Sequence, residues 1–184
     1  MTHARALAAL AEGLDGARSW PGDRRPIALD IAGQHAAVLV FGVDARGRWS
    51  YDIVEAAFEA PHGWSDRGSG GAHGDGWELP WPTDGWPDGP LIDLLGSIGR
   101  GGLDADDSDL GVIEGEHGHA FVLAVAGFVA PQVTRLNITD GAGVARAAVF
   151  EPERAFVRLG IAPLRLSAYD VRGRLLEERV VGSP

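Results

Sequence analysis

The last third of the sequence, from Phe121 to Val181, consists of short apolar runs separated by turn residues. Within it, Leu136 and Ile138 alternate with polar residues, a pattern typical of a β-strand with one face in the core and one in water. Short runs at this spacing are typical of β-sandwiches and barrels. We therefore expect a mainly β chain that forms an antiparallel β-sandwich or jelly-roll-like domain. The strands predicted here are 121–129, 134–138, 144–150, 155–159, 164–169 and 174–181.

One five-residue turn pattern occurs at two places. Asp44-Ala45-Arg46-Gly47-Arg48 and Asp170-Val171-Arg172-Gly173-Arg174 agree at four of five positions. In both, Asp occupies the first position of a type I turn and Gly the position that needs a positive φ. The first turn predicts a hairpin between a buried strand at 36–43 and a return strand at 48–58. Because the flanking strands differ, the repeat indicates one turn type used twice.

The N-terminal segment has the periodicity of a helix. Leu7, Leu10 and Leu14 follow one another at spacings of three and four, and Pro21 lies beyond the end of the pattern. We expect residues 1–20 to form one amphipathic helix that docks on the domain or on a partner. Residues 26–184 are expected to form a single β-sandwich domain, since a chain of 184 residues can bury a core without metals or disulfides.

The composition excludes several kinds of chemistry. The chain has no cysteine, and all 16 basic residues are arginine. It therefore has no thiol nucleophile, thiolate zinc site, iron–sulfur cluster or lysine Schiff base. The net charge of −10 would repel nucleic acid and anionic membrane surfaces, which leaves basic or neutral partners. No apolar run is long enough to span a membrane, so we expect a cytoplasmic protein, and we expect no cofactor.

A long segment, residues 60–111, fits no strand pattern, and only Leu91 to Ile98 has the spacing of a short helix. Its first half is rich in glycine, proline and tryptophan. Disordered linkers are poor in aromatic residues, so we interpret the segment as an ordered insertion. Tryptophan in a loop either anchors the loop to its own domain or faces outward as a recognition surface. The candidate binding residues are Trp64, Trp77, Trp81 and Trp86.

Two histidines, His117 and His119, precede the strand predicted from residue 121, and alternation would place both on one face if the strand begins that early. Their spacing from Gly111 resembles the opening of the metal-binding motif of the cupins, small β-barrels that bind a divalent metal and host many reactions. The resemblance covers about nine residues and then ends, because Leu123 and Ala124 stand where cupins have a glutamate. It implies that both histidines ligate a metal; the alternative is a solvated pair.

Two further patterns do not complete a known site. Residues 104–109 contain four aspartates, but Asp109 and Gly115 occupy positions where a calcium-binding EF-hand loop needs glycine and glutamate. A solvated acidic turn is the better interpretation. Ser69 and Ser97 lack the second flanking glycine of a nucleophile elbow, so neither sequence context indicates a nucleophile.

Three functions follow as hypotheses. The leading one is a non-catalytic binding or interaction module that engages a protein partner through the Trp-rich loop. The first alternative is a cupin-like metal-dependent enzyme that uses His117 and His119. The second alternative is a structural subunit of a larger assembly, for which a homo-oligomer is one form.

Overall fold

The computed structural model describes residues 2–14, 22–75, 90–100, 122–150 and 154–182. It contains one helix and three antiparallel sheets, so the expected mainly β character is confirmed. In these ranges, none of the sheets closes into a barrel. The elements are α1 (Thr2–Glu12), β1 (Gly22–Ala32), β2 (His35–Val43), β3 (Trp49–Glu59), β4 (Gly63–Gly74), β5 (Ile92–Arg100), β6 (Val122–Val129), β7 (Arg135–Thr139), β8 (Ala145–Ala147), β9 (Ala155–Ile161), β10 (Leu164–Tyr169) and β11 (Leu175–Val181).

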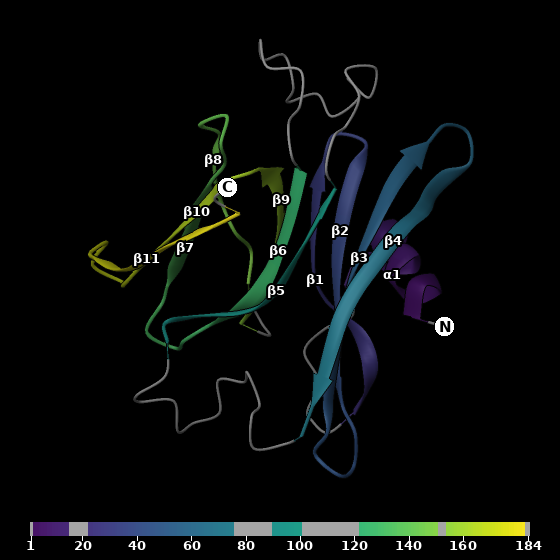
Figure 1. Ribbon diagram of the computed structural model, residues 1–184, viewed down its shortest axis with the longest axis horizontal. Helices are drawn as coiled ribbons and strands as arrows, with labels where there is room; N and C mark the ends of the chain where they lie inside the picture. Colours follow the sequence, from purple (N-terminus) through teal and green to yellow (C-terminus); the bar gives the residue numbers. More distant parts are fainter. Residues whose placement is uncertain (1, 15–21, 76–89, 101–121, 151–153, 183–184) are drawn as a thin grey trace.

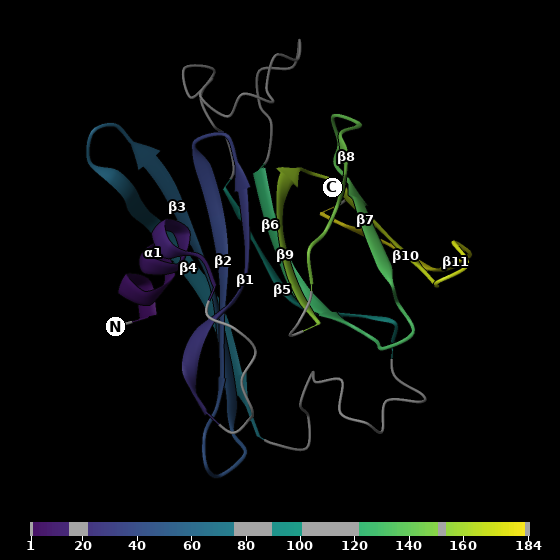
Figure 2. The same cartoon turned by 180° about the vertical axis from the view of Figure 1, so that it is seen from behind.

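The helix and the three sheets form successive layers (Figures 1 and 2). Sheet A has the strand order β1-β2-β3-β4, sheet B the order β5-β6-β9, and sheet C the order β11-β10-β7-β8. The helix α1 covers the outer face of sheet A, and sheet B lies between sheets A and C. A two-layer sandwich has one core between its sheets, whereas this arrangement has two.

Sheet B is apolar on both faces because it serves both cores. Along β6, Ala124 and Phe128 face sheet A, where Phe128 meets Phe41 edge-on with ring centroids 5.3 Å apart. Leu123 and Val125 of the same strand belong to the core shared with sheet C. Since successive side chains of a strand point to opposite faces, a strand buried on both sides has an unbroken apolar sequence. The predicted strand at 121–129 is confirmed as β6.

The predicted hairpin turns are confirmed in detail. The N–H of Gly47 donates to the carbonyl oxygen of Asp44 at 2.9 Å, and Gly47 has a φ of 77°. The Oδ1 atom of Asp44 accepts bonds from the backbone N–H groups two and four residues further on. Asp170 makes the same bonds, and so does Asp140. Within the described residues, the chain thus uses this turn three times.

The expectation that residues 60–111 contain no strand is wrong, because β4 and most of the described remainder of this segment are extended. The strand β4 pairs with β3 although it is rich in glycine. Its glycines lie close to neighbouring atoms: a Cβ on Gly71 would come within 2.0 Å of the carbonyl oxygen of Tyr51, and one on Gly70 within 3.0 Å of the Ile98 side chain. Glycine is needed here because neighbouring atoms leave no room for a side chain. A strand rich in glycine therefore shows no alternating apolar pattern in the sequence.

The short helix predicted for residues 91–98 is also wrong, since this stretch lies in β5. A β-bulge follows Leu94. Ile92 and Leu94 pack on the core shared with sheet C, whereas Leu95 and Ile98 pack on the core shared with sheet A. The extra residue of a bulge reverses which face the following side chains take. Apolar residues therefore recur at helix-like intervals in an extended chain.

The helix α1 ends at Glu12, before the predicted boundary at residue 20. Gly13 has a φ of 90° and its N–H donates to the carbonyl oxygen of Ala9 at 2.9 Å, which ends the helix in a left-handed cap. Residues 15–20 lie outside the described part of the chain. Ala6 packs on Val38 and its neighbours in sheet A. In the described ranges, no helix has the length and apolar character that crossing a membrane would need.

Candidate functional site

Of the four candidate tryptophans, Trp64 is described, whereas Trp77, Trp81 and Trp86 lie outside the described residues. Trp64 on β4 pairs across the strands with Phe58 on β3. Their ring centroids are 5.4 Å apart and their planes meet at 73°, an edge-to-face contact. The side chain of Phe58 is 42% exposed. We call these two residues the aromatic pair.

The aromatic pair lies on the outer face of sheet A, the same face that carries α1. Val54 packs beneath α1, and Phe58 points to the same side because it follows Val54 by four residues along β3. Ile31 on β1 lies on this face as well, because it pairs with Ala36 on β2, which in turn pairs with Ala56 on β3. Its side chain is also 42% exposed. Ile31, Phe58 and Trp64 together are called the outer patch.

The two histidines of the cupin-like motif, His117 and His119, lie outside the described residues, as does the acidic stretch 104–109. Among the residues that the structure describes, no group of three or more His, Asp or Glu side chains is placed to hold a metal ion. The described sheets A, B and C are open, unlike the barrel of a cupin.

A polar cluster that the sequence analysis missed lies between α1 and β4. The Nδ1 atom of His3 contacts Oδ2 of Asp66, and the Nε2 atom of the same ring lies 3.0 Å from Oγ of Ser69. The His3 side chain is 43% exposed and that of Asp66 35% exposed, so the cluster is open to water. We call these three residues the β4 cluster. Its members are a carboxylate, an imidazole and a hydroxyl connected in that order.

A β-bulge brings Asp66 and Ser69 to the same face of sheet A. Asp66 pairs with Ala56 and Ser69 with Val54, and Arg67 is the extra residue of the bulge. In a regular strand, side chains three residues apart point to opposite faces. Bulges often redirect side chains in this way. An Asp and a Ser three residues apart therefore give no sign of proximity in the sequence.

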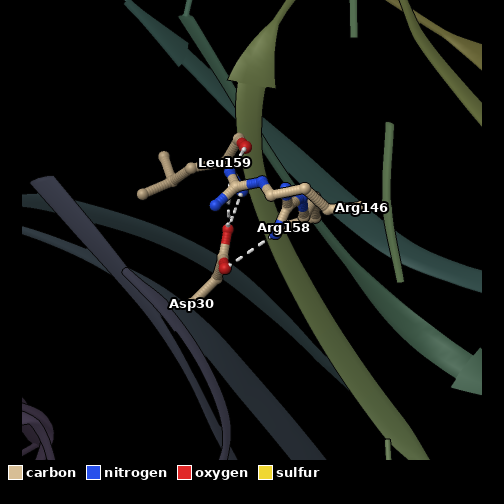
Figure 3. A network of polar contacts seen from close by, with 4 residues as sticks. All are labelled: Asp30, Arg146, Arg158 and Leu159. Carbon is tan, nitrogen blue, oxygen red and sulfur yellow. Dashed lines mark hydrogen bonds and ion pairs between the residues drawn. The ribbon is translucent and has the colours of Figure 1, made fainter. Parts of the chain in front are cut away.

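A second polar cluster surrounds Asp30, where edges of all three sheets meet (Figure 3). Its Oδ1 accepts a bond from Nη1 of Arg158 at 2.9 Å, and its Oδ2 accepts the N–H of Leu159 at 2.9 Å. Arg146 on β8 lies 3.7 Å from the same carboxylate and donates to the carbonyl oxygen of Leu159. Burial raises the pKa of Asp30, although the Leu159 bond and Arg146 oppose it. These partners occupy the carboxylate, so we interpret the cluster as a structural junction.

Comparison of the chain with protein-family models, with curated proteins and with solved structures finds no match. In the part of the chain that the structure describes, the outer patch and the β4 cluster share one face of sheet A.

Proposed function

We propose that this protein is a binding module that engages a protein partner through the outer patch, with α1 beside it as a second contact. The proposal depends on one observation: the Phe58 ring is 42% exposed while it packs against Trp64. Aromatic side chains are enriched in the centre of protein interfaces, where burial of a large rigid ring contributes much of the affinity. Trp77, Trp81 and Trp86 are included in the proposal as further contacts.

For the fold, we propose a β-sandwich formed by sheets A and B, to which sheet C is added on the far side. Sheets A and B share the larger of the two sheet-to-sheet cores, which includes Phe41, Ile53, Phe128 and Leu159. This arrangement supports the binding proposal because, among the described strands, neither sheet B nor sheet C covers the outer face of sheet A.

The charge of the chain favours a basic partner. The net charge is −10, and the carboxylate of Asp66 lies on the same face of sheet A as the aromatic pair. A partner with an apolar anchor and a basic rim would match this surface, and the association rate should fall as salt is added.

A photo-crosslinking amino acid placed at Phe58 tests the contact surface. We expect it to crosslink to one protein partner in the native lysate. The same amino acid at Val171, which is 83% exposed in the turn between β10 and β11, should not capture that partner. With the purified partner, the double variant Phe58→Ala/Trp64→Ala should weaken binding roughly tenfold or more, as side chains at the centre of an interface typically contribute about 2 kcal/mol. The matched variant Val171→Ala should bind as the wild type does.

Equal crosslinking from positions 58 and 171 would contradict the proposal, as would full affinity in a double variant whose circular dichroism shows an intact fold. Crosslinks formed only between copies of this chain, together with a solution mass that rises with concentration, would favour the assembly subunit instead.

A further inference from the structure

The β4 cluster has the atom order of a nucleophilic serine relay. Asp66 contacts Nδ1 of His3, and Nε2 of His3 lies 3.0 Å from Oγ of Ser69. The same order activates the serine hydroxyl on several unrelated folds, where it is recognised by geometry and not by sequence position. We propose that Ser69 is the nucleophile of an esterase site acting on carboxylic esters. This activity goes beyond the proposed binding function and does not depend on it.

Asp66 sets the protonation geometry of His3. Because a carboxylate accepts the Nδ1 proton, the neutral ring keeps a lone pair on Nε2, which faces the Ser69 hydroxyl. The separation of 3.0 Å is within the range for proton transfer to a general base. The other oxygen of Asp66, Oδ1, accepts the N–H of Gly68 at 2.9 Å, which holds the carboxylate in place. Asp66 is thus a positioning residue, and His3 is the base.

The hydroxyl of Ser69 is accessible to an incoming ester. Ser69 is exposed, and its neighbours Gly68 and Gly70 have no side chains to obstruct it. The strand β4 is an edge of sheet A, so alternate backbone N–H groups point away from β3. Such outward N–H groups are the kind of donor that stabilises the oxyanion of a tetrahedral intermediate.

The aromatic pair indicates the class of ester. Trp64, Asp66 and Ser69 follow one another along one face of β4, since they pair with three successive residues on the outer face of β3. Trp64 is therefore roughly 13 Å from Ser69 along the strand, at about 3.3 Å per residue over four paired positions. An ester whose acyl chain is several carbons long can place its carbonyl at Ser69 and its apolar end toward the aromatic pair.

The proposed reaction has two steps and needs only water. In the first, Oγ of Ser69 bonds to the ester carbonyl carbon while Nε2 of His3 takes the hydroxyl proton; the carbon–oxygen bond to the alcohol then breaks, and the alcohol leaves with that proton. In the second, His3 takes a proton from water as the water oxygen attacks the acyl-serine, and the proton returns to Oγ as the carboxylic acid leaves. Nothing is oxidised or reduced.

Labelling of the full chain with a fluorophosphonate tests the nucleophile directly, because this probe phosphonylates activated serines. We expect peptide mapping to find the label on Ser69 and Ser69→Ala to abolish it. His3→Gln should lower the labelling rate at least about 100-fold, as general-base catalysis typically contributes that much. The matched variant Ser97→Ala removes an exposed strand serine of β5 and should label as the wild type does.

Hydrolysis of p-nitrophenyl esters tests the substrate class. We expect a higher kcat/KM for the octanoate than for the acetate, and Phe58→Ala should reduce this preference by raising KM for the octanoate alone. Absence of label on Ser69, or a labelling rate that a folded His3→Gln variant leaves unchanged, would overturn the proposal. Ser69→Ala leaves the aromatic pair unchanged, so the affinity of this variant for the purified partner reports on the binding proposal separately.

Discussion

Asp30 is a single residue that satisfies hydrogen-bonding groups on a neighbouring sheet. It accepts the backbone N–H of Leu159, which lies on the edge strand β9, and it pairs with Arg158, whose side chain is only 7% exposed. An edge strand has no neighbouring strand to receive its outward N–H groups. A buried N–H or guanidinium without a partner destabilises the fold far more than the loss of an exposed ion pair does. The side chain at position 30 therefore joins sheet A to sheet B.

Replacement of Asp30 by Ala should lower the free energy of unfolding by about 3 kcal/mol, because it leaves both the Leu159 N–H and the Arg158 guanidinium without this acceptor. Asp30→Asn should lower the free energy of unfolding by clearly less. The amide oxygen of Asn still accepts the Leu159 N–H. Burial raises the pKa of Asp30, so the folded protein disfavours the ionised carboxylate that Asn removes. Urea unfolding measures both values.

The exposed pair between Arg165 and Glu178 provides the control. Arg165→Met should change stability by less than about 1 kcal/mol, as exposed ion pairs usually do. Equal effects of Asp30→Ala and Arg165→Met would show that Asp30 does not join the sheets.

At the scale of elements, the Asp-initiated turns are the most regular feature of the chain. In the turn between β2 and β3, the side chain of Arg48 and backbone N–H groups lower the pKa of Asp44. In the turn between β10 and β11, the backbone N–H of Arg174 is the main cause of the lowered pKa of Asp170. Both carboxylates therefore stabilise their turns most strongly when they are ionised.

The pH dependence of stability follows from this lowered pKa. An acid whose pKa falls on folding stabilises the fold fully above its unfolded pKa, here 3.8, and this contribution disappears as pH falls through the lower folded value. Asp170→Asn keeps an oxygen acceptor but removes the charge. We expect the wild type to be more stable than this variant at neutral pH, and the difference to shrink below pH 3.8.

Urea midpoints measured between about pH 2 and pH 7 test this expectation. The control is Arg172→Gln, which changes the charge of an exposed residue in the same turn and should follow the pH dependence of the wild type. A stability difference between the wild type and Asp170→Asn that stays constant over this range would contradict the prediction.

For the whole molecule, the decisive feature is that sheet B is shared by two cores. Phe128 faces sheet A and Phe156 belongs to the core with sheet C, and both are fully buried. Since the strands β6 and β9 contribute to both cores, loss of either core exposes one face of the same sheet. Sheets A, B and C are therefore expected to unfold together.

Removal of either ring tests this coupling. Phe128→Ala and Phe156→Ala should each lower the free energy of unfolding by about 3–5 kcal/mol, through lost burial and the cavity left behind. Tryptophan fluorescence and far-UV circular dichroism should report one coincident transition in each variant. Val149→Ala, at an exposed position, should have little effect. Separate transitions for the two signals would show that the layers unfold independently.

The sequence by itself determined the β character, the strands of the last third and the hairpin turns. These features depend on neighbours along the chain: alternation sets which face a side chain takes, and an Asp followed three residues later by Gly sets the turn. The strand predicted at 144–150 is shorter, at Ala145–Ala147, but lies in the expected place. Nothing in the pattern indicated β1, whose pairing with β2 contains two irregularities that interrupt alternation.

Only the tertiary structure decided the strands β4 and β5, the order of the layers and the β4 cluster. The glycines of β4 lie close to atoms of Tyr51 and Ile98, where a side chain would collide. The bulges of β4 and β5 reverse the face that the following side chains take, and residue spacing does not show this reversal. His3 meets Asp66 and Ser69 across 63 and 66 residues of chain. Contacts at such separations arise when sheets and helix pack, and local sequence patterns carry no information about them.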